Sequence, residues 1–101
     1  MSADIIQSLA RSQSYALTTS SVAETVTQIK QHEPGTVVYA VHTVEGQPLQ
    51  RIFYELYRDK AAFEAHEAAP HTRRYLAERG QYLASTEVDW LTLQTGKGTG
   101  G

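Results

Sequence analysis

The sequence contains no cysteine, which excludes disulfide bonds, thiolate metal sites and a cysteine nucleophile. Its longest unbroken apolar run, Val37 to Val41, is far shorter than the roughly 20 residues that a membrane-spanning helix needs. It also lacks a basic block, because 9 Lys and Arg stand against 11 Asp and Glu, for a net charge of −2. We therefore expect neither nucleic acid nor a membrane as a partner.

Length and composition predict one small globular domain. A chain of 101 residues leaves no room for a second core, and 41% hydrophobic residues are too many for a disordered chain. The first residues, Met1 to Asp4, lack the basic flank and apolar stretch of a secretory signal, so we expect a soluble, cytoplasmic protein. We interpret residues 1–20 as an N-terminal arm with a possible first strand, residues 21–94 as the domain, and residues 95–101 as a flexible Gly/Thr tail.

The first half of the chain predicts a strand followed by a helix. Residues 14–19 are rich in β-branched and aromatic side chains, which favours a short strand. Ser21 and Glu24 have the spacing of a capping box, and apolar residues recur at helical spacing over residues 22–32. The sequence Glu33-Pro34-Gly35 ends this helix, because proline disfavours helical geometry in the residue before it and glycine can turn the chain.

The second half predicts a hairpin, a broken helix and a final strand. Residues 36–44 and 52–57 read as strands on either side of turn residues. Asp59 is placed to cap a helix, which Pro70 interrupts so that a second piece runs to Arg79. Residues 87–93 read as the last strand. The order predicts an α+β fold: a ferredoxin-like antiparallel sheet with helices on one face.

The predicted strands are apolar on both faces, although a sheet with helices on one side should alternate apolar and polar residues. In residues 52–57, for example, Ile52 and Leu56 oppose Phe53 and Tyr57. Because so short a chain cannot supply a second helical layer, we expect a second copy of the chain to cover the other face. The prediction is a homodimer whose sheets form a dimeric α+β barrel. The alternative is a monomer with its N-terminal arm folded over the sheet.

Three short segments resemble the antibiotic biosynthesis monooxygenase (ABM) domain family. They are Glu33-Pro34-Gly35 before a strand, residues 53–59 (FYELYRD), and residues 62–71 with their Pro70-His71 pair. The resemblance covers roughly residues 33–93. It implies small dimeric α+β barrels with a pocket between the sheet and the broken helix. Well-known members oxidise aromatic polyketide-type phenols to quinones with O2, without metal or flavin, so no cofactor is expected.

Departures from the family pattern narrow the expected chemistry. Haem-degrading relatives use an asparagine, a helical tryptophan and a histidine that binds iron. This sequence has no asparagine, carries His66 at the helical tryptophan position, and reads Tyr75-Leu76 in the ligand region. We therefore do not expect haem degradation. Several quinone-forming members also rely on Asn and Trp in the pocket, for which this chain offers only Trp90.

His66 and His71 flank the helix break and are candidate proton carriers, since imidazole titrates near neutral pH. A cofactor-free oxygenase needs such a base, because its substrate must become an electron-rich phenolate or enolate before O2 reacts. We predict His66 as catalytic and His71 as substrate-binding. The alternatives are a surface or structural role for His66 and a simple helix-start position for His71. Their spacing is not that of helical metal ligands, so no metal site is predicted.

Glu55 is unusual because a carboxylate within an apolar strand is costly to desolvate unless it is paired or lines a cleft. We predict it as the catalytic partner of His66, acting as a base or hydrogen-bond acceptor. The alternative is a structural ion pair, within the chain or across the dimer. Its candidate partners in that case are Arg51, Arg58, Arg73 and Arg74.

Aromatic side chains complete the expected pocket. Tyr57, Tyr75 and Trp90 could stack on a planar substrate, although such residues also serve as ordinary core. The predicted function is a cofactor-independent monooxygenase that acts on a small aromatic or polyketide-like phenol. The alternatives are an isomerase of a small oxo compound and a non-catalytic dimeric binding domain.

Overall fold

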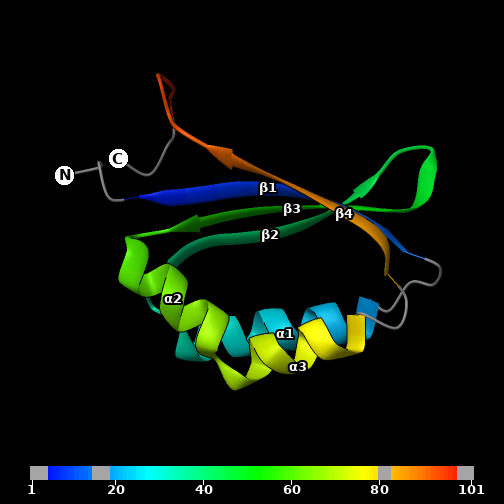
Figure 1. The fold of residues 1–101 in the computed structure, drawn as a ribbon, viewed down its shortest axis with the longest axis horizontal. Helices are drawn as coiled ribbons and strands as arrows, with labels where there is room; N and C mark the ends of the chain where they lie inside the picture. Colours follow the sequence, from blue (N-terminus) through cyan, green and yellow to red (C-terminus); the bar gives the residue numbers. More distant parts are fainter. Residues whose placement is uncertain (1–4, 15–18, 80–82, 98–101) are drawn as a thin grey trace.

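A computed structural model of the chain describes residues 5–14, 19–79 and 83–97. The four strands form one antiparallel sheet in the order β2-β3-β1-β4. All three helices lie on one face of this sheet (Figure 1), which confirms the predicted ferredoxin-like α+β architecture. The elements are β1 (Ile6–Ser14), α1 (Thr19–His32), β2 (Thr36–Val44), β3 (Gln47–Tyr57), α2 (Lys60–Ala68), α3 (Pro70–Arg79) and β4 (Leu83–Leu91).

The first strand lies earlier than the sequence predicted. Strand β1 spans Ile6–Ser14. Of the strand expected over residues 14–19, Ser14 ends β1 and Thr19 begins α1, whereas residues 15–18 fall outside the described part of the chain. Strand β1 occupies the centre of the sheet, between β3 and β4, and so does not fold as an arm over the other face. Its buried residues are the small Ser8, Ala10 and Ser12, which lack the bulky or β-branched character that signals a strand.

The boundaries of α1, β3 and β4 also differ from those predicted from the sequence. Helix α1 begins at Thr19, so Ser21 lies inside the helix and the predicted capping box does not start it. Strand β3 extends back to Gln47, because the turn before it is tight and is made at Gly46, whose φ is 77°. Strand β4 runs over Leu83–Leu91 rather than residues 87–93.

The broken helix matches its prediction. Asp59 caps α2, and its side chain accepts a hydrogen bond of 2.8 Å from the backbone N–H of Ala62. Helix α2 ends at Ala68, and α3 begins at Pro70, where proline suits a first helical turn. This break positions the site described below.

The two faces of the sheet differ in what covers them. The inner face packs against the helices through Ala10, Phe53 and Tyr75. The outer face carries Leu9 opposite Tyr54 on β3, and Leu56 opposite Val38 on β2. The outer face therefore carries apolar residues on β2 and β3 and at Leu9, beside polar ones such as the Arg11–Asp89 pair, while the described helices cover only the inner face (Figure 1). No helix among the described residues is long and apolar enough to cross a membrane.

Candidate functional site

A turn at the end of α1 places a carboxylate inside the helical layer. Glu33 follows the last residue of α1 and precedes Pro34, which disfavours helical geometry at Glu33. Its backbone is held on both sides: its N–H donates to the carbonyl of Ile29 at 2.9 Å, and its carbonyl accepts from the N–H of Thr36 at 3.1 Å. The residue is only 8% exposed.

Gly35 lets α2 pack directly against this turn. A Cβ atom at Gly35 would lie 2.5 Å from the Cβ of Ala62, a separation that side chains do not tolerate. The carbonyl of Gly35 also accepts a 2.9 Å hydrogen bond from the N–H of Arg58. Glycine is therefore needed here for close approach of α2, which brings that helix within reach of Glu33.

The break between α2 and α3 brings two histidines to the same carboxylate. His66 lies in the last turn of α2, and His71 is the second residue of α3. Nδ1 of His66 lies 2.8 Å from Oε1 of Glu33, while Nε2 of His71 contacts Oε2. The hydroxyl of Thr36 donates to Oε1 at 2.7 Å. Both oxygens of one carboxylate are thus occupied by imidazoles that come from two helices.

This arrangement fixes the charge of Glu33. Burial by itself raises the pKa of Glu33, but the hydrogen bonds from His71, Thr36 and His66 outweigh it, so that its pKa lies below the usual value. Glu33 is therefore ionised at neutral pH. Because an ionised carboxylate can only accept, Nδ1 of His66 donates to Glu33. A neutral imidazole that donates through Nδ1 carries its lone pair on Nε2.

A second carboxylate lies on the other side of His66. Nε2 of His66 is 4.0 Å from Oε1 of Glu55, and the hydroxyl of Tyr57 donates to that same oxygen. Burial raises the pKa of Tyr57, and the neighbouring Glu55 raises it further, so Tyr57 stays a neutral phenol. The rings of Tyr57 and Tyr39 lie 5.2 and 5.5 Å from that of His66, measured between centroids.

His66 and Glu55 line a cavity of about 250 Å³ between the sheet and the helices. The small Ser8 and Ala10 of β1 line it as well, so the weak strand signal of β1 and the space for the cavity share one cause. The lining also includes Phe53, Phe63, Tyr75, Leu76, Val88 and Trp90. Of these, Leu76, Val88 and Trp90 are 42%, 47% and 62% exposed, which places the opening beside β4 and α3.

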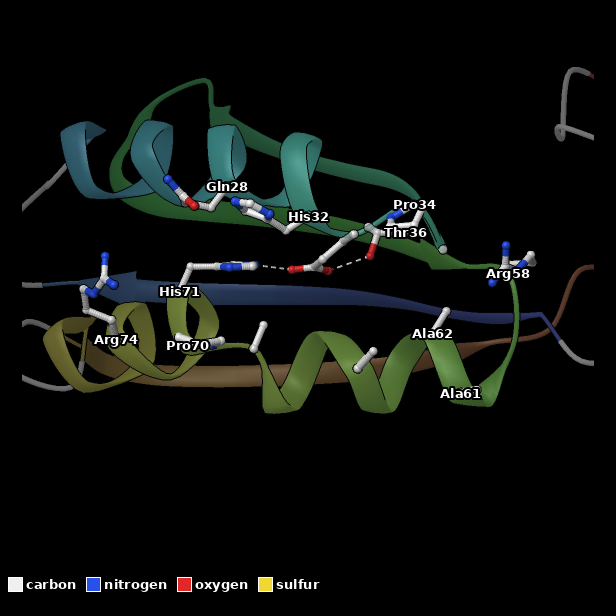
Figure 2. Close-up of a pocket in the computed structure, with 14 residues that line it drawn as sticks. Gln28, His32, Pro34, Thr36, Arg58, Ala61, Ala62, Pro70, His71 and Arg74 are labelled. Carbon is white, nitrogen blue, oxygen red and sulfur yellow. Dashed lines mark hydrogen bonds and ion pairs between the residues drawn. The ribbon is translucent and has the colours of Figure 1, made fainter.

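A second hollow, of about 610 Å³, lies on the opposite side of Glu33, between α1 and the α2–α3 pair. We call it the helix groove. Figure 2 shows His71 extending from α3 toward the carboxylate that also binds Thr36. Four alanines of the α2 region line part of the groove, and Arg58, Arg74 and His32 line it as well.

The predicted site residues separate into two groups. His66, Glu55, Tyr75 and Trp90 all line the cavity, so the structure brings together both residues predicted as catalytic. Tyr57 lies behind Glu55 and is completely buried. His71 lies across Glu33 in the helix groove. The roles of all six remain predictions.

Three of the four arginines considered as partners of Glu55 have other contacts. Arg58 pairs with Asp59 at 3.4 Å, and Arg74 pairs with Glu24 at 3.8 Å. Arg51 donates to backbone carbonyls of its own strand. The carboxylate of Glu55 instead lies beside His66 and Tyr57.

Sequence reasoning missed Glu33, which we interpreted only as part of a helix stop. The signal that could have found it is an acid that Pro34 holds out of a helix, combined with two histidines on either side of Pro70. Within the described residues, no group of three or more His, Asp or Glu side chains is arranged to hold a metal ion.

Comparison with known proteins identifies related folds. The family model of the antibiotic biosynthesis monooxygenases matches residues 15–78. A protein from Bacteroides thetaiotaomicron, named as an antibiotic biosynthesis monooxygenase, has a TM-score of 0.84 at 20% identity, with 94% of each chain covered. A Caulobacter crescentus protein with the same name has a TM-score of 0.83 at 18% identity, covering 91% of this chain and 92% of that one.

A third structure has a more specific name. SnoaB, a cofactor-independent oxygenase from Streptomyces nogalater, has a TM-score of 0.79 at 16% identity, covering 93% of this chain and 97% of SnoaB. At these identities, the structural likeness establishes the fold. None of the curated proteins compared with the chain matches it.

Proposed function

Because the chain belongs to the antibiotic biosynthesis monooxygenase family, whose model matches it over residues 15–78, we propose that it is a cofactor-independent monooxygenase. Its substrate is a small aromatic or polyketide-like phenol, which it oxidises with O2. The observation that carries the proposal is the buried His66, whose Nδ1 is held by the ionised Glu33 while its ring lines the cavity.

The proposed first step is removal of the phenolic proton. Nε2 of His66 accepts this proton, and Glu33 both fixes the tautomer of the ring and compensates the imidazolium that forms. Glu55, 4.0 Å from Nε2, adds a second negative charge on the cavity side. The phenolate that remains is electron-rich enough to react with O2 directly. General-base catalysis of this kind contributes about 100-fold to 10,000-fold in rate.

The oxidation balances without an added reductant. One oxygen atom of O2 enters the ring, and the ring C–H and phenolic O–H become two carbonyl groups. The other oxygen atom leaves as water and carries both hydrogen atoms. The phenol supplies all four electrons, and His66 returns its proton to the departing oxygen.

The cavity suits a small, flat, partly polar molecule. Its volume of about 250 Å³ lies just below the range of drug-sized ligand pockets, which begins at about 300 Å³, so it suits a small ligand. Phe53, Tyr75 and Trp90 offer aromatic surface for stacking. The hydroxyl of Thr86 is buried in the cavity wall with no hydrogen-bond partner among the described residues, and it can bind a substrate oxygen.

Oxygen uptake with a labelled gas tests the proposal. The purified chain is mixed, under isotopically heavy O2, with a dihydroxynaphthalene whose ring position para to a hydroxyl carries hydrogen, and both O2 consumption and product mass are followed. We expect one O2 consumed per phenol, with one heavy atom in the quinone and the other in water. A product of unchanged mass without oxygen uptake would indicate an isomerase of a small oxo compound. Absence of turnover with a range of phenols would favour a non-catalytic binding domain.

We also propose that the chain is a homodimer, because the outer face of its sheet carries a group of apolar residues on β1, β2 and β3 and no described helix covers that face (Figure 1). Leu9 and Tyr54 lie on this face and are half-buried. We expect sedimentation at micromolar concentration to give a dimer, and Leu9→Glu to give a monomer because it buries a charge at the interface. A parent chain that sediments as a monomer would contradict the proposal.

A further inference from the structure

We propose that Glu33 couples two proton sites on opposite sides of the helical layer, so that a proton gained by His66 in the cavity is matched by a proton released from His71 into the helix groove. This inference rests on the proposed function for its catalytic meaning. The juxtaposition behind it, two imidazoles on the two oxygens of one buried carboxylate, does not depend on the reaction. His71 is then a positioning residue that acts on the cavity through Glu33.

The geometry makes the connection continuous. His66 lines the cavity and His71 lines the helix groove, and they are 4% and 7% exposed. Between them, Oε1 of Glu33 contacts Nδ1 of His66 at 2.8 Å, and Oε2 contacts Nε2 of His71. The hydroxyls of Thr36 and Thr72 lie at the same junction, 2.7 Å from Oε1 of Glu33 and 3.5 Å from Nδ1 of His66. The three groups therefore span the helical layer from one hollow to the other.

A shared carboxylate makes the protonation of the two rings interdependent. One negative charge compensates one imidazolium, whereas two buried imidazoliums on one carboxylate repel each other. When Nε2 of His66 takes the phenolic proton, His71 gives the proton of its other ring nitrogen to groove water. When His66 returns its proton to the departing oxygen, His71 takes one back. Glu33 stays ionised, and the cluster keeps one imidazolium throughout.

Surrounding charges favour this direction of coupling. The cavity side of His66 holds the carboxylates of Glu55 and Glu67, together with the neutral phenols of Tyr57 and Tyr39. The groove side of His71 holds a third imidazole and two arginines, the arginines being partly offset by acidic neighbours. These are His32, with its ring centroid 6.4 Å from that of His71, Arg58 paired with Asp59, and Arg74 paired with Glu24. Once His66 has taken the phenolic proton, the nearby carboxylates stabilise its imidazolium, and the arginines on the groove side ease the release of the proton from His71.

The coupling lowers the electrostatic cost of forming an imidazolium in an active site from which substrate has excluded water. A substrate that fills the small cavity excludes the water that would otherwise neutralise a new imidazolium. Proton exchange through the helix groove keeps the net charge of the cluster constant without admitting water to the cavity. The reactive phenolate is thereby formed in a dry environment, where a stray proton cannot reach it.

Nitrogen-resolved NMR titration of the histidine rings, with no substrate present, tests the coupling. In His71→Gln the carboxylate is left to His66 alone, so we expect the titration midpoint of His66 to rise by about one pH unit. Glu33→Gln moves it the opposite way. His42→Gln, on the opposite face of the sheet from this cluster, is the matched control and leaves it unchanged. A His66 midpoint that is the same in His71→Gln as in His42→Gln overturns the proposal.

Titration of the parent chain gives a second test of the coupling, one that does not depend on whether a variant folds. Coupled sites titrate in two shared steps, so the curves of His66 and His71 should each show inflections at the same two pH values. Independent single-step curves overturn the coupling. Oxygen uptake by the parent is measured in parallel. If the two histidines titrate together but no oxygen is consumed, the coupling stands and the proposed function is wrong. If oxygen is consumed but the two curves are independent, the proposed function stands and the coupling is wrong.

Discussion

Replacing Glu33 by glutamine removes the charge at the centre of the site while keeping the shape of its side chain. The carboxylate accepts hydrogen bonds from His66 at 2.8 Å, from Thr36 at 2.7 Å and from His71. In Glu33→Gln the amide oxygen replaces one acceptor oxygen, and the amide N–H group replaces the other. The N–H group of the glutamine amide then faces either Nε2 of His71 or Nδ1 of His66. Because both nitrogens donate hydrogen bonds to Glu33 in the parent, two donors would face each other.

The size of the effect follows from these contacts. A hydrogen bond to a charged group contributes about 1.5–3 kcal/mol. The substitution converts one such bond into a clash of donors and weakens the remaining two, so we expect a loss of about 3 kcal/mol in the free energy of unfolding. For a domain of this size each kcal/mol lowers the melting temperature by about 4–8 °C, so the expected fall is roughly 15 °C.

The loss should depend on pH in a defined direction. The folded state lowers the pKa of Glu33 below its usual 4.5, so the stabilisation from Glu33 is fully present above pH 4.5 and is lost as pH falls through the folded pKa. The difference between the parent and Glu33→Gln should therefore be largest near neutral pH and should shrink in acid.

Urea denaturation followed by circular dichroism, near neutral pH and well below pH 4.5, measures both effects. Glu64→Gln is the matched control, because Glu64 is an exposed carboxylate 3.9 Å from Lys60. Its loss should cost less than about 0.5 kcal/mol. If Glu33→Gln were as stable as Glu64→Gln, or if its deficit did not change with pH, the reasoning about the buried carboxylate would be refuted.

Three further substitutions test other parts of the site. Gly35→Ala should lower the free energy of unfolding by about 1–3 kcal/mol, because the added Cβ would lie 2.5 Å from that of Ala62; a thermal melt equal to that of the parent would contradict the close packing of α2. Tyr57→Phe removes the hydroxyl that donates to Glu55, so stability should fall by about 1–2 kcal/mol and the rate of phenol oxidation should fall with it. Unchanged values of both would show that the Tyr57–Glu55 bond has no role. Trp90→Ala, at a position 62% exposed on the rim, should raise KM for an aromatic substrate about fivefold with little change in melting temperature. An unchanged KM would remove Trp90 from the substrate site.

The sequence predicts most of this fold because most elements carry strong local signals. Residues 36–44 are dense in β-branched side chains and form β2 as predicted, and Asp59 and Pro70 begin α2 and α3 as their side-chain chemistry requires. The same reasoning does not predict strand β1, because the residues that it buries, Ser8, Ala10 and Ser12, are small and polar or only weakly apolar. These residues are buried because the helices pack over them and because β1 lies in the middle of the sheet. Both are features of the tertiary structure, so the local sequence does not predict them.

The site was predictable only in part. His66 and Glu55 could be singled out because a histidine at a helix break and a carboxylate in an apolar strand are unusual in themselves. The role of Glu33 could not, since its partner His66 lies 33 residues further along the chain and meets it only after α2 packs on Gly35. Strand alternation correctly put Glu55 and Tyr57 on one face. It could not show that the cavity ends before Tyr57.

The central claim is that Nε2 of His66 accepts the proton of a phenol bound in the cavity. The most direct test compares initial rates of dihydroxynaphthalene oxidation by the parent, His66→Gln and His42→Gln, after circular dichroism has shown that all three are folded. We expect His66→Gln to lose at least about 100-fold in rate, while His42→Gln keeps the rate of the parent. A folded His66→Gln that oxidises the phenol as fast as the parent would contradict the account.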